Sequence, residues 1–511
     1  MIKLVLIACL SVALIGLQGC TTALPAYDRP PSYALPIDED SHLSRFIQTM
    51  QPPDSQLSGF KLLHNGSDAL AARLQMIELA EQSIDLQYYI YSADLTGALI
   101  ADRLIAAADR GIRVRILLDD IGTDLPDFRL ATLDEHHNIS VRFFNPLTLR
   151  QKWLSYLSKI GEFGRINYRM HNKLVIADGQ VFITGGRNIG DEYFELSDLY
   201  FQDVDIMGIG PVSRDVMRSF DEFWNSPKSV PVAALADGSD GSDIDRLRQA
   251  LRTRAEEQRG NPYLLSVARS PFNRVLKDRH RSWHWGTAEW VYDPPSKASP
   301  DGAASEVPVV GRALVRHAKE ARDEILMMTA YFIPGDQGEA FLMELANEGV
   351  EVKLLTNSLA TNDILAVHSS YAAYRKNLLA NGMQMWELRP VAAQQGRASP
   401  LFSDSLASLH AKSFVFDRAK VFVGSINLDP RSIHLNTESG VVVHQPELAK
   451  EMARLFDRWT SDDFAYRLTI AEDGSLLWRA DGRTWTTEPG TSRLRRIKAW
   501  LLGLLPIEKY L

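Results

Sequence analysis

The sequence contains very little cysteine, no metal-ligand spacing and no apolar run long enough to cross a bilayer comfortably. Only Cys9 and Cys20 occur among 511 residues, which leaves no basis for a disulfide framework. The apolar stretch from Leu4 to Leu17 is shorter than the roughly 20 residues of a transmembrane helix. The net charge of -8 argues against broad binding to nucleic-acid backbones, which requires a basic face. A composition of 45% hydrophobic and 23% charged residues indicates a globular chain, and a length of 511 residues suggests two or more domains.

The N-terminus has the features of a secretion signal. Lys3 precedes the apolar stretch, which ends in "LQGC" at positions 17–20. This ending resembles the lipobox of bacterial lipoproteins, in which the cysteine is acylated and becomes the first mature residue. We therefore expect a signal peptide over 1–19, lipidation of Cys20 and a location in the bacterial cell envelope, facing the periplasm. The alternative is an uncleaved signal anchor, and the choice between inner and outer membrane stays open.

A Pro-rich polar stretch over 20–45 follows, and we expect it to be a tether. Beyond it the chain repeats itself. "DALAARLQMIELAEQSIDLQYYIY" from Asp68 and "RALVRHAKEARDEILMMTAYFIP" from Arg312 each combine a helical period with a strand-like run. Helices that alternate with short β-rich runs favour an α/β fold with a mostly parallel or mixed sheet. We predict two such repeats, packed as a pseudo-twofold bilobal body, over 46–235 and 306–470.

The segment over 236–305 is predicted to be a linker or insert, and 471–511 a C-terminal tail. The linker contains the aromatic cluster "HRSWHWGTAEWVYDPP" from His280, which favours either local packing or a lip around an apolar substrate. The loop over 389–405 lacks periodicity, and we expect it to cover the site. The tail ends in "TSRLRRIKAWLLGLLPIEKYL", which predicts either a basic amphipathic segment on an anionic bilayer or a helix docked on the body.

The chemistry is carried by one motif that occurs twice. "MHNKLVIADGQVFITGGRN" from Met170 and "LHAKSFVFDRAKVFVGSIN" from Leu409 share five residues at equal offsets of 239 positions. Each motif is expected to form a β-hairpin with its His and Lys on one face. The shared residues are His171, Lys173, Asp178, Gly185 and Asn188 in the first copy, and His410, Lys412, Asp417, Gly424 and Asn427 in the second.

Two histidines, two lysines and two asparagines in one cleft suit attack on a phosphodiester. A neutral histidine can attack phosphorus, while a protonated one gives a proton to the leaving alkoxide. Lysine ammonium and asparagine amide groups can hold the non-bridging oxygens. Each histidine needs a carboxylate that fixes its tautomer. Asp178 and Asp417 are candidates in the hairpin turns, but Asp203 and Glu438, which lie on β-like runs after the motifs, are better ones. This chemistry requires no metal or cofactor.

Both motifs resemble the HKD signature of the phospholipase D superfamily, over nearly the whole mature chain. The continuations "GSINLDPRS" and "DVDIMGIGPV" are most similar to cardiolipin synthases, in particular the lipoprotein-type C group. The resemblance implies two α/β lobes around a shared site and a phosphohistidine on His171, with His410 as acid and base. It also implies that Asp203 and Glu438 pair with the imidazoles. Gly186 stands where the second copy has Ser425, which puts symmetric phosphate contacts in doubt.

The leading hypothesis is a phosphatidyltransferase that moves a phosphatidyl group onto phosphatidylglycerol and yields cardiolipin. Phosphatidylethanolamine or a second phosphatidylglycerol would be the donor, at a membrane surface. Hydrolysis to phosphatidic acid is the main alternative, and it uses the same catalytic residues. A nuclease and a non-catalytic envelope lipoprotein are further alternatives, but we expect no nucleic-acid partner. The sequence leaves a protein partner open.

Overall fold

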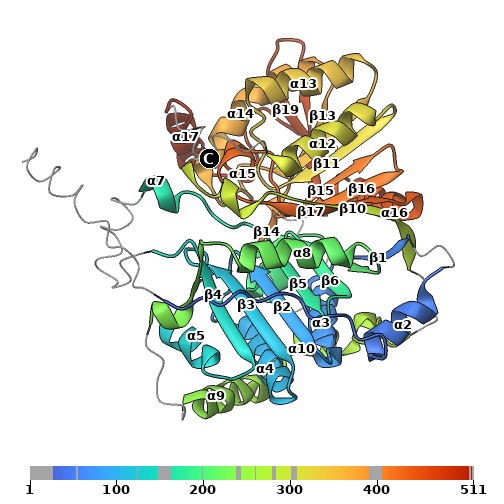
Figure 1. Ribbon diagram of the computed structural model, residues 1–511. Coiled ribbons are helices and arrows are strands. Elements are labelled where there is room, and N and C mark those ends of the chain that lie inside the picture. The colour runs from blue at the N-terminus through green and yellow to red at the C-terminus, as the bar shows by residue number, and fades with distance from the viewer. Residues whose placement is uncertain are drawn as a thin grey trace, which may run out of the picture.

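The computed structural model of the chain consists of two α/β lobes (Figure 1). It describes residues 27–52, 56–123, 125–147, 163–197, 199–236, 243–258, 260–278, 283–300, 308–390, 406–505, 508 and 511. The predicted signal peptide, Cys20 and most of the predicted covering loop lie outside these residues. Within the described part of the chain, no helix combines the length and apolar character needed to span a membrane.

The N-terminal lobe is built on eight strands of one sheet. Strands β2, β3 and β4 run parallel, and β1, β5, β6, β8 and β9 extend the sheet by antiparallel pairing. The strands of this sheet are β1 (Ser58–Leu63), β2 (Ser83–Tyr88), β3 (Arg113–Asp119), β4 (Ile139–Phe144), β5 (Leu174–Ala177), β6 (Val181–Gly185), β8 (Asp205–Ile209) and β9 (Ser229–Pro231), and β7 (Leu199–Gln202) lies outside it. The helices are α2 (His42–Met50), α3 (Gly66–Leu79), α4 (Leu95–Asp109), α5 (Asp127–Asp134), α7 (Phe163–Ile166), α8 (Ser213–Trp224), α9 (Asp243–Glu257) and α10 (Pro262–Arg269).

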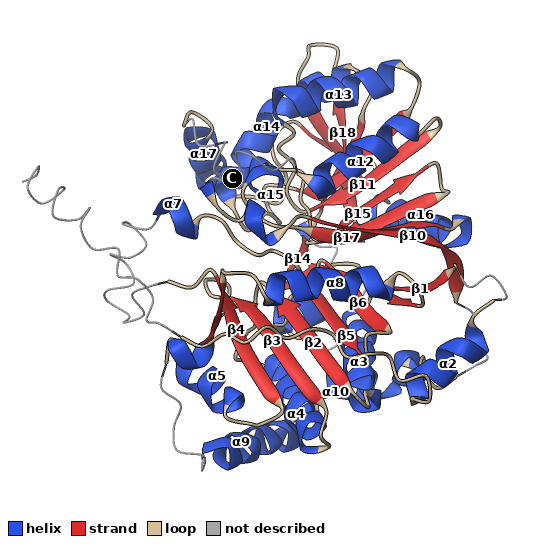
Figure 2. Ribbon diagram, in the orientation of Figure 1, coloured by secondary structure: helices blue, strands red, loops and turns tan. Residues whose placement is uncertain are grey.

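The C-terminal lobe repeats this plan, with helices on both sides of its strands (Figure 2). Strands β11, β12 and β13 are parallel, as are β2, β3 and β4 in the first lobe. The strands are β10 (His284–Tyr292), β11 (Glu324–Thr329), β12 (Glu351–Asn357), β13 (Gln384–Leu388), β14 (Leu406–Leu409), β15 (Lys412–Phe416), β16 (Lys420–Gly424), β17 (Ser439–His444), β18 (Ala465–Ile470), β19 (Leu476–Ala480) and β20 (Arg483–Trp485). The helices are α12 (Val309–Glu320), α13 (Gly335–Asn347), α14 (Leu365–Ala380), α15 (Pro430–His434), α16 (Pro446–Trp459) and α17 (Arg493–Leu502).

The lobes are joined by backbone pairing and by a common core. Antiparallel pairing of β1 with β10, with Gly59 opposite Trp285, makes the two sheets continuous. One hydrophobic cluster combines residues of both lobes, among them Phe182 and Trp290, whose rings meet edge to face. Burial of apolar surface from both lobes is the main force that holds them together. The predicted α/β fold with two repeats is thus confirmed, and the sheet is mixed.

The hairpins form as the sequence predicts, although β5 starts three residues after His171 and β15 two residues after His410. Asp178 and Gly179 at the first turn, and Asp417 and Arg418 at the second, have φ between 48° and 65°. Two successive left-handed residues are what a type I′ turn requires. In the second turn Arg418 adopts the left-handed conformation that Gly179 adopts in the first. The Arg418 side chain there pairs with Glu324.

The described part of the predicted tether is packed on the N-terminal lobe and is not a free linker. Residues 27–41 form a strap that crosses the strands of the N-terminal lobe (Figure 1). Side chains of that lobe hold the strap, because Arg115 donates to the carbonyl oxygen of Ser32 and Arg142 to that of Pro30. A Pro-rich composition suggested flexibility, but arginines on β3 and β4 satisfy the carbonyl groups of the strap. The predicted boundary at residue 45 therefore lies inside α2.

The predicted linker is divided between the lobes. Helices α9 and α10 pack on α4 and α3 of the N-terminal lobe, whereas β10 pairs with β17 and begins the C-terminal sheet before residue 306. The aromatic cluster packs into the body of the protein: Trp283 and Trp290 are buried, and the Trp290 indole donates to Ser219 on α8. Of the two interpretations of this cluster, the structure supports packing.

Candidate active site

Backbone pairing between the lobes brings the two motifs together. Strand β14, just before His410, pairs in parallel with β7, just before Asp203. A matching parallel bridge joins Met170 to Thr437. In both places the histidine amide donates to the other lobe: His410 to Gln202 at 2.8 Å and His171 to Thr437 at 3.0 Å. Each histidine therefore lies beside the carboxylate of the opposite repeat.

The histidine–carboxylate pairs are crossed between the repeats. His171 Nδ1 lies 3.0 Å from both carboxylate oxygens of Glu438, and His410 Nδ1 lies 2.6 Å from Asp203 Oδ2. Both carboxylates are fully buried. A carboxylate at Nδ1 fixes the proton there and leaves Nε2 available for chemistry. The sequence predicted Asp203 and Glu438 as partners, but it did not predict that each would serve the histidine of the other repeat.

The difference between Gly186 and Ser425 follows from the two carboxylates. A Cβ atom at position 186 would lie 2.1 Å from Asp203 Oδ1, so only glycine fits there. In the second repeat the longer Glu438 accepts a hydrogen bond from the Ser425 hydroxyl, which also accepts from the Ser439 amide. The hydroxyl thus supports a carboxylate. Its absence at Gly186 does not remove a phosphate contact, contrary to the doubt raised from the sequence.

Each lysine lies beside the histidine of its own motif. Lys173 Nζ donates to the His171 carbonyl oxygen at 2.6 Å, and Lys412 donates to the His410 carbonyl oxygen in the same way. Both side chains are almost completely buried. Because an ammonium group has three donors, each lysine retains hydrogen-bonding capacity for an anion between the histidines.

The two asparagines have different surroundings. Asn188 Oδ1 accepts from the Ile90 amide at 3.2 Å, and its side chain also bonds to Tyr193. Asn427 Oδ1 is buried with no hydrogen-bond partner. A buried polar atom without a partner is uncommon in native proteins. The pair is therefore less symmetric than the sequence predicts.

Asp178 and Asp417 lie at the opposite ends of their hairpins from the histidines. The Asp178 carboxylate accepts hydrogen bonds from the backbone amides of residues 81–83, and Asp417 does so from those of residues 322–324. Strands β5 and β15, at about 3.3 Å per residue, separate these carboxylates from the imidazoles. Their inclusion among the catalytic residues is therefore corrected: both carboxylates stabilise the junction between a helix and the next strand.

Several aromatic and cationic residues of the site were not predicted. The Tyr89 ring contacts His171 with centroids 5.1 Å apart, while Tyr193 and Phe201 contact His410 at 5.2 and 5.0 Å. Arg431 on α15 bonds to Asn167 of the other lobe. Tyr89 lies at the end of a strand and Arg431 follows the second motif. These positions in the sequence were enough to suggest Tyr89 and Arg431 as site residues. The position of Phe201 gives no comparable indication.

Burial and mutual repulsion determine the charges in the site. Burial, with Lys173, Lys412 and Arg431 nearby, lowers the pKa of His171 well below its usual value. Burial and Lys412 lower the pKa of His410 to about 4. The pKa of Lys173 falls to about 7 and that of Lys412 to about 8, in both cases mainly through burial. At neutral pH the resting site therefore contains neutral imidazoles.

The pKa values of the two carboxyl groups, Glu438 and Asp203, shift in opposite directions. Burial raises the pKa of Glu438 to about 7. The pKa of Asp203 is lowered, because His410, Lys412 and Arg187 together outweigh the opposing effect of its burial. His410 therefore faces an ionised carboxylate, whereas burial makes ionisation of the carboxyl beside His171 less favourable.

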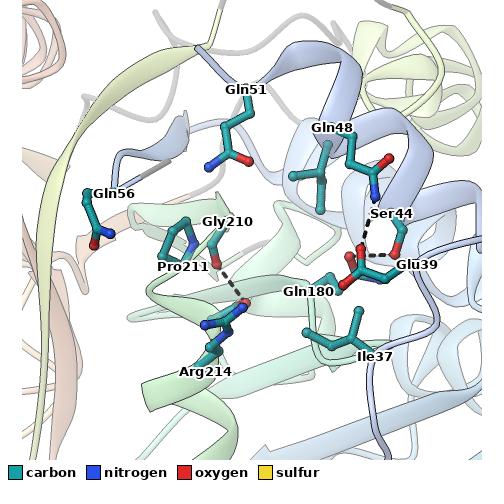
Figure 3. A pocket seen from close by; sticks show the side chains of 12 residues that line it. Ile37, Glu39, Ser44, Gln48, Gln51, Gln56, Gln180, Gly210, Pro211 and Arg214 are labelled. Carbon is teal, nitrogen blue, oxygen red and sulfur yellow. Dashed lines mark hydrogen bonds between the residues drawn. The ribbon is translucent and has the colours of Figure 1, made fainter. Parts of the chain in front are cut away.

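A polar pocket of the N-terminal lobe lies away from the histidines. It is formed by the strap, α2 and the start of α8, with Ser44, Gln180 and Arg214 in its wall (Figure 3). Gln180 follows the hairpin turn at the far end of β5 from His171. This pocket is thus separate from the paired motifs.

Comparisons with known proteins agree with this geometry. The family model described as cardiolipin synthase, PLD-like domain matches residues 74–224 and 314–460. Cardiolipin synthase C of Escherichia coli (strain K12) is 37% identical over 87% of this chain and 94% of its own. Cardiolipin synthase 1 of Bacillus anthracis is 26% identical over 86% of this chain and 73% of its own. The crystal structure of phosphatidylserine synthase from Haemophilus influenzae Rd KW20 has a TM-score of 0.56 at 13% identity, over 92% of this chain and all of that one, which indicates a shared fold.

Proposed function

Because this chain belongs to the family of phospholipase D-like cardiolipin synthase domains, we propose that it moves a phosphatidyl group between two phospholipids through a phosphohistidine at His171. The chain is a phosphatidyltransferase of the cardiolipin synthase type. The observation that carries the proposed mechanism is the crossed pairing of His171 with Glu438 and His410 with Asp203. It leaves two Nε2 atoms free to act in turn on one phosphorus atom.

The proposed reaction has two balanced steps. His171 Nε2 attacks phosphorus, the bond to the headgroup oxygen breaks, and His410 Nε2 gives a proton to the leaving alkoxide. The acceptor hydroxyl then loses its proton to His410 and attacks phosphorus, which breaks the P–N bond. Lys173 and Lys412 hold the non-bridging oxygens throughout. Water as acceptor would give phosphatidic acid by the same steps.

The carboxylates support this division of roles. His171 attacks as a neutral imidazole, because burial holds its pKa well below the usual value and Glu438 accepts the proton of Nδ1, so that the Nε2 lone pair is free. His410 must become an imidazolium, and the ionised Asp203 at 2.6 Å stabilises one. The phosphodiester also supplies a negative charge between the rings, which raises the pKa of His410 on binding. His410 therefore acquires its proton when substrate is present.

The proposed substrates are phosphatidylglycerol as acceptor, with phosphatidylethanolamine or a second phosphatidylglycerol as donor. We place the reaction at a membrane surface of the bacterial cell envelope, with the protein anchored through Cys20 and facing the periplasm. The lipobox-like sequence supports this location. Tyr27, which belongs to the strap, is only seven residues from Cys20 in the sequence, so a lipid on Cys20 would keep the body close to the membrane.

The test uses purified protein in mixed micelles of isotopically labelled phosphatidylglycerol and phosphatidylethanolamine. Mass spectrometry measures cardiolipin, phosphatidic acid and the released alcohol. We expect cardiolipin from the native protein, none from His171→Asn, and an unchanged yield from His136→Asn, which alters a histidine paired with Asp109 outside the site. Phosphatidic acid without cardiolipin would make the enzyme a hydrolase, and no turnover of either lipid would reject the proposal.

A further inference from the structure

Helix α17 and the turn after it carry a concentration of exposed apolar side chains. Six of the 13 large apolar residues that are exposed in the described chain lie between positions 494 and 505. Trp500 is 65% exposed and Leu504 63%. We call these six residues the α17 ridge: Leu494, Ile497, Trp500, Leu501, Leu504 and Leu505. Monomeric soluble proteins rarely expose so compact an apolar set without a binding role.

The ridge belongs to a helix that is fixed to the body. Ala499 is buried, and the Arg495 side chain donates to the carbonyl oxygens of Leu359 and Asn362 at 2.9 and 2.6 Å. Arg496 donates to the backbone carbonyls of Glu488 and Thr491. The helix therefore docks on the body through one face, as one of the two interpretations of the tail predicts, and presents an apolar face outward.

The charges beside the ridge have one sign. Residues 493–505 contain four basic residues and no acidic one. Two of the four, Arg493 and Lys498, are exposed. An amphipathic helix with a basic flank and a tryptophan is typical of the interface of an anionic bilayer. In a symmetric dimer through this helix, two ridges with basic flanks would face each other, and charge repulsion disfavours that contact.

The chain after the ridge reaches the catalytic elements. The Arg431 amide donates to the Leu511 carbonyl oxygen at 2.7 Å, and Arg431 lies four residues after Asn427. The guanidinium of Arg431 bonds to Asn167 of the N-terminal lobe. In Figure 1, α17, α15 and α7 lie on the same side of the molecule.

We propose that the α17 ridge inserts into the interface of an anionic phospholipid bilayer and holds the catalytic cleft against the surface that supplies its substrates. This inference rests on the proposed lipid substrates but not on the catalytic steps. The strap adds to it, because at about 3.5 Å per residue a lipid on Cys20 lies within about 25 Å of Tyr27. The anchor keeps the protein at the membrane, and the ridge sets its orientation.

The first test measures where the ridge lies in the membrane. Full-length protein carrying Leu504→Cys is labelled with an environment-sensitive fluorophore and reconstituted into vesicles of phosphatidylethanolamine and phosphatidylglycerol. The matched control is Leu265→Cys on α10, an exposed leucine of the other lobe, and the unsubstituted protein gives the labelling background. We expect brominated lipids to quench the label at 504 at least about threefold more than the label at 265, because interfacial helices bury their apolar face among the acyl chains.

Equal quenching at both positions would overturn the proposal. The proposal would also be overturned if the fluorophore at 504 reported an apolar environment without vesicles and did so more strongly at higher protein concentration. That result would mean that a second copy of the chain covers the ridge. Vesicles of neutral phosphatidylcholine should give weaker quenching, since the basic flank then lacks its counter-charge.

The second test separates orientation from chemistry. The double substitution Trp500→Ser with Leu504→Ser should lower turnover of vesicle lipids about tenfold or more, while turnover of short-chain lipids in detergent stays unchanged, because only the vesicle requires docking. Leu265→Ser should leave both activities unchanged. Equal losses in both assays would refute an orienting role. If the native protein turns over neither lipid, the proposed function fails, and the quenching experiment still decides whether the ridge docks.

Discussion

The crossed pairing of histidines and carboxylates predicts unequal effects of Asp203→Asn and Glu438→Gln. Asp203 is ionised and lies 2.6 Å from His410. Two unit charges about 4 Å apart interact by about 4 kcal/mol at an effective dielectric constant of 20. Loss of this stabilisation of the imidazolium corresponds to a fall in kcat of about 10³-fold. Glu438 supports a histidine that attacks as a neutral base, so Glu438→Gln removes a hydrogen bond worth about 1.5–3 kcal/mol, or roughly 10- to 100-fold.

The assay compares two donors that differ in their leaving group. A phosphatidyl ester of p-nitrophenol releases a stable anion that needs no proton, so the first step no longer depends on His410. The burst of nitrophenolate should therefore be nearly normal in Asp203→Asn and reduced in Glu438→Gln. With phosphatidylglycerol as donor both variants should be impaired, Asp203→Asn more severely. Glu289→Gln, a partly exposed carboxylate on β10 that pairs with Arg316, is the matched control.

The reasoning would be refuted if the activated donor rescued Glu438→Gln and left Asp203→Asn impaired. That result would mean that Asp203 serves the nucleophile. Thermal unfolding of each variant establishes that the differences do not arise from partial unfolding, because buried charges also contribute to stability.

Three further predictions concern single positions. Asp178→Asn should lower the free energy of unfolding by about 1–3 kcal/mol, because the carboxylate accepts from three backbone amides, and should change kcat per folded molecule by less than about twofold; a large loss of kcat without a loss of stability would contradict its structural role. Burial and Lys412 lower the pKa of His410 to about 4, whereas the same imidazole in the unfolded chain binds its proton at about pH 6.5. The free energy of unfolding should therefore fall by about 3 kcal/mol as the pH is lowered from 6.5 to 4. Chemical denaturation over this pH range should find a smaller fall in His410→Asn. Gly186→Ala should lower kcat at least about tenfold, because its Cβ would lie 2.1 Å from Asp203 Oδ1, while Gly164→Ala, which meets no atom within 4 Å, should not.

The repeat explains why much of the site could be predicted from the sequence. Equal offsets between the two motifs identified His171, Lys173, His410 and Lys412, and the structure brings all four together. Helical and strand-like periods were sufficient for the fold because apolar side chains follow the period of the element they stabilise.

The crossing of the carboxylates could not be predicted in this way. His171 and Glu438 are 267 residues apart, and His410 and Asp203 are 207 apart. Their pairing depends on β7 meeting β14 and on the bridge of Met170 with Thr437, which are contacts between repeats. A pattern within one repeat contains no information about them.

The strap was misjudged for a different reason. Its few apolar residues suggest a flexible segment, but its carbonyl groups bind arginines of β3 and β4. Asp178 and Asp417 were assigned to catalysis because they belong to the repeated motif. A repeated residue can equally well be required by a repeated turn, as both carboxylates are here.

The most direct test of the central claim is to locate the covalent intermediate. Protein is mixed with the p-nitrophenyl donor without acceptor, quenched within the burst and digested with trypsin, which separates His171 in residues 170–173 from His410 in residues 398–412. The account predicts a phosphatidyl adduct on peptide 170–173, more of it in Asp203→Asn, and none in His171→Asn. An adduct on peptide 398–412, or turnover in His171→Asn, would contradict it.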